Sequence, residues 1–194
     1  NSALELNGAS VCVQQGTTTE LNLADYFSAN KMQLKSVTFA TANEAVKAYD
    51  AGRCDAYTTD ASALYAERLR VSDPNDHIIL PEIISKEPLG PAVRHGDDQW
   101  FDIVKWTLFA MMNAEELNIS SKNVDEALKS TNPEIKRFVG TESNFGEQLG
   151  LGKDWAVRIV KQVGNYGETF ERNVGLGSPL KIERGLNKLW TKGG

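Results

Sequence analysis

Apolar and polar residues alternate in two different periods along the first third of the chain, and these periods predict strands followed by helices. The stretch VCVQQGTTTELNLADYF, residues 11–27, begins with a short apolar strand at 11–14. A T-x-x-E pattern at Thr17 and Glu20 predicts a capping box that starts a helix. One face of this helix is expected to carry Leu21, Ala24 and Phe27.

Two further pairs of strand and helix follow before residue 70. The segment QLKSVTFA alternates apolar and polar residues and predicts a second strand, after which Thr41 and Glu44 form a second capping box. Gly52 supplies the left-handed stop of that helix. The segment CDAYTTD predicts a third strand, and Asp60 is placed to cap a helix in ASALYAERLR. The order βαβαβα is typical of an α/β fold in which helices cover a parallel sheet.

The carboxyl ends of the predicted strands hold the candidate ligand-binding residues. Parallel α/β sheets bind ligands beyond this edge, near the point where the strand order reverses. If the first strand lies between the second and the third, the GTTTE turn and Asp60 emerge side by side. The open N-terminus of the helix favours an anion, and the Asp60 carboxylate favours an ammonium group. Together they fit a zwitterionic α-amino acid; the alternative is that these residues are ordinary helix caps.

The second half of the chain is predicted to be helical. Three prolines, at positions 81, 88 and 91, indicate an extended segment, after which a helix is expected over residues 97–117. Shorter helices are expected at 121–130 and 133–139, and residues 153–174 predict a helix interrupted at Gly164 and Gly167. The apolar stripe of the long helix is interpreted as core, and it comprises Trp100, Ile103, Val104, Thr107, Leu108, Met111 and Met112.

Composition and charge narrow the classes of partner. Of the 194 residues, 41% are hydrophobic, which is enough for a sizeable core. The net charge of −5 and pI of about 5.2, with scattered cationic residues, make nucleic acid and anionic membranes unexpected partners. Two cysteines and two histidines are too few for an expected metal site. No apolar run reaches the roughly 20 residues of a membrane span, and any signal peptide is expected to have been removed.

Three segments of the chain resemble one protein family. They are ALELNGASVCVQQGTTTELNLADYF, AVKAYDAGRCDAYTTDASALYAERL and LGPAVRHGDDQWFDIVKWTLFAMMNAEELNI. They resemble the periplasmic amino-acid-binding proteins of ABC transporters, in particular the general L-amino-acid-binding subgroup. The resemblance implies a type II-like periplasmic-binding-protein fold, with strand order second-first-third in the sheet. It also implies an extracytoplasmic, periplasmic solute-binding function for a broad range of L-amino acids, with a membrane permease as partner.

The resemblance also implies roles for individual residues. Thr18 and the backbone of Thr19 would hold the ligand carboxylate, Asp60 would hold its α-ammonium group, and Gln14 would line the side-chain pocket. A disulfide between Cys12 and Cys54 is also implied, because such proteins mature in an oxidising compartment. Two buried free thiols are the alternative for this pair.

One departure from the family concerns length. These proteins have two lobes, and the segment that makes most of the first lobe has no counterpart here. We therefore expect residues 5–87 to form lobe two and residues 88–194 to form the C-terminal part of lobe one with a helical extension. The Arg that pairs with the ligand carboxylate in the family has no match. Without the rest of lobe one, some apolar residues are expected to need a partner surface, namely Trp155, Phe170 and Trp190. A homodimer or exchanged segments would provide it.

Two other functional classes remain open at this point. One is an enzyme of the cyclohexadienyl or arogenate dehydratase kind on the same architecture, and the other is the ligand-sensing domain of a receptor. The enzyme needs a general acid, and the sequence offers no candidate beyond Asp60. We therefore expect a binding protein with no catalytic residue, no metal and no cofactor.

Overall fold

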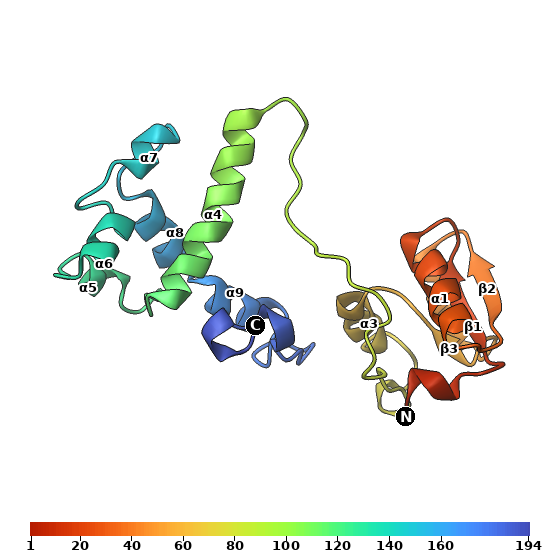
Figure 1. Cartoon of the computed structure of the whole chain (residues 1–194). Coiled ribbons are helices and arrows are strands. Elements are labelled where there is room, and N and C mark those ends of the chain that lie inside the picture. The colour runs from red at the N-terminus through yellow and green to blue at the C-terminus, as the bar shows by residue number, and fades with distance from the viewer. The chain divides into compact units, whose positions relative to one another are not determined.

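The computed structural model describes all 194 residues, and the chain divides into two compact units (Figure 1). The N-terminal unit comprises residues 1–88 and the C-terminal unit comprises residues 89–194. The extended segment between His77 and Asp97 contains no helix or strand, in agreement with the three prolines in it. The assignment of the two units to the lobes of a binding protein stays a prediction.

A parallel sheet of three strands forms the centre of the N-terminal unit. The strands are β1 (Ser10–Gln14), β2 (Lys35–Phe39) and β3 (Ala56–Tyr57), in the order β2-β1-β3. This order confirms the predicted one. Strand β3 is shorter than the predicted strand at 54–60, because only two of its residues pair with β1. The Thr58 N–H still donates to the Cys12 carbonyl at 3.1 Å before the chain turns into the next helix.

The two faces of β1 are covered by different helices, since successive side chains of a strand point to opposite faces. Helix α1 (Thr18–Ala29) packs Leu23 and Phe27 against Val11 and Val13. On the other face, Cys12 packs with residues of α2 (Ala42–Asp50). The prediction that Leu21 and Ala24 lie on the inner face of α1 is wrong, because Leu21 is 66% exposed, Ala24 is exposed as well, and Leu23, four residues before Phe27, is buried instead.

A disulfide fastens the α2 side of the sheet. Cys12 and Cys54 are bonded, their Cα atoms are 5.7 Å apart, and the sulfurs lie in a cluster with Ala48. The disulfide expected from the family resemblance is therefore present. It connects the central strand to the loop that leads from α2 into β3, and α3 (Ala61–Arg68) follows β3.

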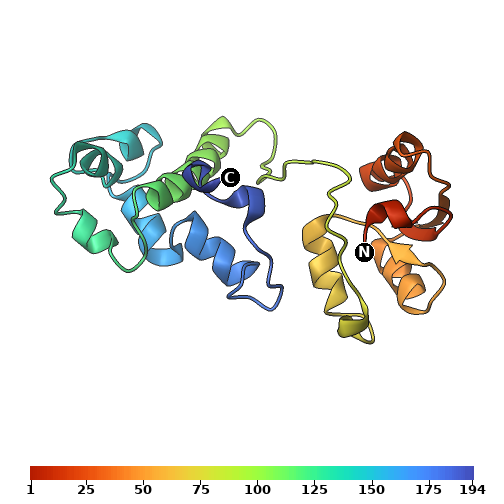
Figure 2. The ribbon, with the colours of Figure 1, turned by 60° about the horizontal axis from the view of Figure 1, so that its bottom comes forward.

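The C-terminal unit is entirely helical (Figure 2). Its longest helix, α4, runs over Asp98–Glu116, close to the predicted 97–117. No helix of the chain is both long and apolar enough to cross a membrane. The remaining helices are α5 (Val124–Ala127), α6 (Pro133–Phe138), α7 (Phe145–Gln148), α8 (Trp155–Val163) and α9 (Tyr166–Asn173), with short 3₁₀ turns η3 (Gly185–Asn187) and η4 (Trp190–Lys192).

Small and β-branched residues make up the buried core of the C-terminal unit. The buried cluster consists of Ala114, Ile119, Val124, Val139, Val157 and Val160. The predicted core stripe of α4 is only partly correct, because Trp100 is 51% exposed and Met112 is 42% exposed, whereas the small residue Ala110 is buried. The predicted helix at 153–174 is interrupted at Gly164, where φ is +86°, but Gly167 lies inside α9.

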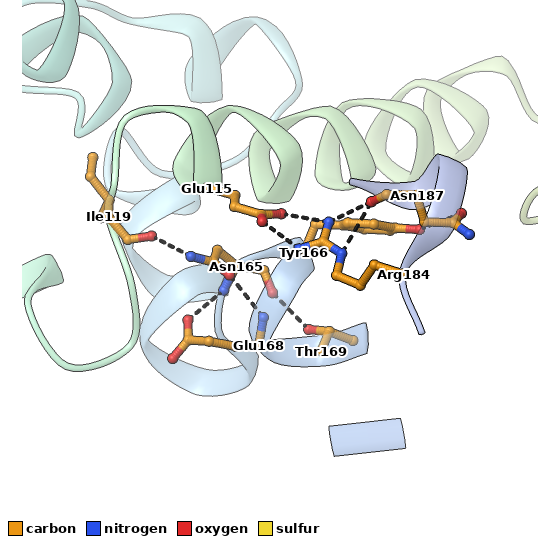
Figure 3. Close-up of polar contacts among 8 residues, drawn as sticks. All are labelled: Glu115, Ile119, Asn165, Tyr166, Glu168, Thr169, Arg184 and Asn187. Atoms are coloured by element: carbon orange, nitrogen blue, oxygen red, sulfur yellow. Dashed lines mark hydrogen bonds and ion pairs between the residues drawn. The ribbon is translucent and has the colours of Figure 1, made fainter. Parts of the chain in front are cut away.

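A capping box starts α9 and joins it to the loop after α4 (Figure 3). The Glu168 carboxylate accepts from the Asn165 N–H at 2.8 Å and from the Ser121 hydroxyl at 2.6 Å. The Asn165 side chain donates to the Ile119 carbonyl at 2.9 Å. Burial raises the pKa of Glu168, but the hydrogen bonds from Ser121 and Asn165 outweigh burial and hold the pKa below its usual value.

This lowered pKa predicts an acid-sensitive contribution to stability. The Glu168 contribution is complete above the pKa of the unfolded chain and is lost as pH falls through the lower pKa of the folded state. We expect Glu168→Gln to destabilise the C-terminal unit by about 1 kcal/mol at pH 7 and by less at pH 3. Urea titrations followed by tryptophan fluorescence test this, because all four tryptophans lie in this unit. An equal loss at both pH values would contradict the prediction.

Candidate functional site

The turn between β1 and α1 is closed by side chains that belong to the turn itself. The Thr17 hydroxyl donates to the Gln14 carbonyl at 2.8 Å and accepts from the Glu20 N–H at 3.2 Å. The Glu20 carboxylate accepts from the Gly16 N–H at 2.6 Å. The predicted capping box is therefore only half formed, because Glu20 binds the N–H of Gly16 and not that of Thr17. Gly16, at φ +70°, provides the left-handed residue that the turn needs.

The first residues of α1 leave backbone donors free at this edge. The N–H groups of Thr18 and Thr19 belong to the first helical turn, where no carbonyl of the helix can accept from them. Neither N–H makes a hydrogen bond, and Thr18 is exposed. The helix N-terminus adds a partial positive charge. The turn therefore presents two donors and a hydroxyl to an anion.

Asp60 occupies the N-cap position of α3 without capping it. Its φ and ψ are −53° and 141°, and its side chain makes no cap hydrogen bond. The prediction that Asp60 caps this helix is wrong, and its exposed carboxylate is free to bind another group. Burial raises the pKa of the neighbouring Tyr57 phenol, a hydrogen bond with Thr59 lowers it, and the negative charges of Glu67 and Asp60 raise it by smaller amounts. The Asp60 carboxylate after β3 is thus a negative group that can bind a cation.

The sheet register brings the turn and Asp60 to one edge. Cys12 of β1 pairs with Tyr57 of β3 in a parallel ladder. The Thr58 N–H still donates to the Cys12 carbonyl, and the two strands run in the same direction up to this edge. The α1 turn and Asp60 both follow at the carboxyl edge of the sheet. The free N–H groups of Thr18 and Thr19 follow β1, and the free Asp60 carboxylate follows β3, the strand next to β1.

Gln14 has a structural contact that the sequence did not predict. Its side-chain N–H₂ donates to the Ala40 carbonyl at 3.4 Å, so it connects the end of β1 to the chain just after β2. The predicted role of Gln14 in a side-chain pocket stays a prediction. Sequence reasoning also missed the contact of Glu20 with Gly16, although a carboxylate four residues after a turn glycine is the signal that could have revealed it.

Several proteins of named function are similar in sequence to the chain. No protein-family model matches the chain. The chain is 65% identical to the general L-amino acid-binding periplasmic protein AapJ of Rhizobium johnstonii, and 58% identical to the putative amino-acid ABC transporter-binding protein YhdW of Escherichia coli. It is 51% identical to the glutamate/glutamine/aspartate/asparagine-binding protein BztA of Rhodobacter capsulatus. Each match covers the whole of this chain and 57–58% of the relative.

A solved structure shows the same fold. The ABC transporter periplasmic binding protein from Brucella ovis, with glutathione bound, superposes with a TM-score of 0.94 and shares 63% sequence identity. The match covers all of this chain and 61% of that one. The chain thus spans less than two thirds of the length of each of these proteins, and it carries an α/β fold of the type II-like kind expected from the sequence.

Proposed function

Since this chain belongs to the family of periplasmic amino-acid-binding proteins of ABC transporters, we propose that it contributes one wall of a site for α-amino-acid groups. The complete protein would act as the extracytoplasmic solute-binding component of a transporter and deliver its ligand to a membrane permease. The observation that carries this proposal is that the free Asp60 carboxylate and the free N–H groups of Thr18 and Thr19 follow two neighbouring parallel strands, at the same edge of the sheet.

Each residue has a separate role in this proposal. The N–H groups of Thr18 and Thr19 and the Thr18 hydroxyl bind the ligand α-carboxylate, where the positive end of α1 stabilises the negative charge. Asp60 binds the α-ammonium group through charge-assisted hydrogen bonds. Because every α-amino acid carries these two groups, such a wall fixes the ligand class and leaves the choice among side chains to the other residues of the site.

The ligands that appear in the names of the relatives carry the two groups that this wall would bind. Amino acids carry the α-ammonium and α-carboxylate, and glutathione carries the same pair at its γ-glutamyl end. A wall that binds only this pair accepts both kinds of molecule. The Cys12–Cys54 disulfide fits an oxidising compartment such as the periplasm. Simple binding and release need no catalyst, and we infer a non-enzymatic function.

The role of Asp60 predicts a loss of binding that does not depend on the ligand side chain. In a protein extended to the length of the relatives, we expect Asp60→Ala to weaken the binding of glutamate, alanine and glutathione by about 100-fold or more, since an unpaired buried ammonium is strongly destabilising. Isothermal titration calorimetry measures this. Asp25→Ala is the control, because Asp25 is an exposed acid of the same unit without a hydrogen bond.

An N-acetylated ligand separates the ammonium contact from other effects. N-acetylglutamate lacks the α-ammonium group, so the unsubstituted protein should bind it far more weakly than glutamate. The Asp60→Ala variant should bind the two ligands with similar, low affinity. If Asp60→Ala still prefers glutamate to the same degree, Asp60 is not the ammonium-binding residue and the proposed site is incorrect.

A further inference from the structure

The segment of residues 174–194 contains no buried large apolar side chain. We call this segment the C-terminal strap. Two of its large apolar residues, Leu186 and Trp190, are 69% and 73% exposed. Its first residues continue directly from α9, where the Leu176 N–H donates to Glu171 at 3.0 Å. After Ile182, the burial of apolar side chains therefore does little to hold the strap against the helices.

One arginine connects the later part of the strap to two helices (Figure 3). The Arg184 guanidinium donates through Nη1 and Nη2 to both carboxylate oxygens of Glu115, near the C-terminus of α4, with the Nη2 bond at 3.1 Å. Each of the two side chains is only 14% exposed. A bidentate pair of this kind is stronger and more specific in geometry than a single charged hydrogen bond.

Aromatic rings and a strap carbonyl complete the surroundings of the guanidinium. Its central carbon lies 5.4 Å from the ring centre of Tyr166 and 5.6 Å from that of Phe170, both on α9. Nε and Nη2 donate to the Asn187 carbonyl at 3.1 and 2.5 Å. The Tyr166 hydroxyl donates to the Asn187 side chain at 3.3 Å. No other hydrogen bond or ion pair joins residues 183–194 to the helices.

A glycine on α9 provides the space for the ion pair. A Cβ atom added at Gly167 would lie 2.8 Å from Arg184 Nη1 and 2.8 Å from Glu115 Oε1. These distances are shorter than van der Waals contact, so an alanine would push the two charged groups away. Glycine inside a helix is otherwise unfavourable, which indicates a packing reason for it at this position.

We propose that Arg184, Glu115 and the two aromatic rings form a clasp that holds the C-terminal strap against α4 and α9. The clasp is a conformational device of the C-terminal unit: when it is closed, Arg184 covers Tyr166 and Phe170, and when it opens, residues 183–187 are released from the two helices. Removal of the charge of one partner leaves the other charge partly buried and unpaired, so the clasp is expected to open when Glu115 loses its charge.

Tryptic cleavage at neighbouring strap residues tests the clasp. Trypsin must take the Arg184 side chain into its specificity pocket, so cleavage after Arg184 requires an open clasp. Lys188 is exposed in the same strap, and its side chain makes no hydrogen bond or ion pair, so it serves as an internal reference. We expect cleavage after Arg184 to be about tenfold slower than after Lys188, by analogy with the protection of other locally closed segments. Mass spectrometry of time points gives both rates.

Substitution of the acid should remove this protection. Glu115→Gln is expected to raise the rate of cleavage after Arg184 by about tenfold and to leave the rate after Lys188 unchanged. Glu116→Gln changes the adjacent, exposed acid of α4 and should leave both rates unchanged. Gly167→Ala should act like Glu115→Gln, because it displaces the same charged groups from the other side.

Three results would overturn the proposal. The first is cleavage after Arg184 as fast as after Lys188 in the unsubstituted chain. The second is an unchanged ratio of the two rates in both Glu115→Gln and Gly167→Ala. The third is an equal rise in cleavage after Lys161 of α8, which would mean that Glu115 supports the whole helical unit and does not act on the strap.

Discussion

Removal of the Cys12–Cys54 disulfide is expected to lower the free energy of unfolding of the N-terminal unit by about 4 kcal/mol, because the bond closes a long loop. The two cysteines are 42 residues apart in the sequence, so the bond strongly restricts the unfolded chain. Both residues are buried, at 0% and 6% exposure, so reductant reaches the bond only after local opening. The double variant Cys12→Ala/Cys54→Ala therefore measures the contribution more directly than added reductant does.

The two units give separate signals in this experiment. All four tryptophans lie in the C-terminal unit, so tryptophan fluorescence should report an unchanged unfolding transition there. Four of the five tyrosines lie in the N-terminal unit, and near-ultraviolet circular dichroism should show its melting temperature falling by more than 15 °C, since about 4–8 °C corresponds to 1 kcal/mol in a domain of this size. A fall of less than 3 °C would contradict the prediction. An equal fall in both transitions would show that the units unfold together.

The sheet of the N-terminal unit was predictable because its signals are local. Val11 and Val13 alternate with Cys12, and this period of two assigns the residues to opposite faces before any contact is known. The parallel order follows from the alternation of strands and helices along the chain. The inner face of α1 was misassigned, although the spacing favours Leu23: it lies four residues before Phe27 and shares its face, whereas Leu21 lies six residues before Phe27 and points elsewhere.

The candidate site was predictable in its residue types but not in its hydrogen bonds. Sequence patterns place a cap at Asp60 and a capping box at Thr17 and Glu20, since Asp and Thr are preferred at these positions. The structure leaves the Asp60 side chain without a cap bond and directs Glu20 to Gly16. Such choices depend on side-chain rotamers, which propensity does not determine. The departure of Asp60 from its expected contact is the kind of local exception that is found at binding sites.

The clasp had no signal in the sequence at all. Glu115, Gly167 and Arg184 are separated by 17 to 69 residues, and none belongs to a recognisable motif. In α4, the interpretation of large apolar residues as core was partly wrong because small residues face the buried cluster. Ala110 and Ala114 are 5% and 0% exposed, and they allow α8 and α9 to approach α4 closely. Hydrophobic periodicity identifies an apolar face but not which of its residues the neighbouring helices cover.

Gly140→Ala is expected to lower the free energy of unfolding of the C-terminal unit by about 3–5 kcal/mol, because it combines backbone strain with a collision. Gly140 ends α6 at φ +82°, and its N–H donates to the Arg137 carbonyl at 3.3 Å while the Thr141 N–H donates to the Lys136 carbonyl at 3.1 Å. These two bonds form the Schellman motif that closes many helices with a left-handed glycine. A Cβ atom at Gly140 would lie 2.1 Å from the Lys153 carbonyl oxygen, a backbone atom that cannot rotate away.

A second glycine of the same unit separates the free-energy cost of backbone strain from that of the steric clash. Gly96 has a φ of +88°, and a Cβ atom added there meets nothing within 4 Å. Gly96→Ala should therefore show the strain alone, about 1–2 kcal/mol, in urea titrations followed by tryptophan fluorescence. The difference between the two variants measures the close approach of the α6 end to Lys153. Equal losses in both variants would mean that the backbone near Lys153 moves aside freely, and the packing of these two segments would then contribute little to the stability of the unit.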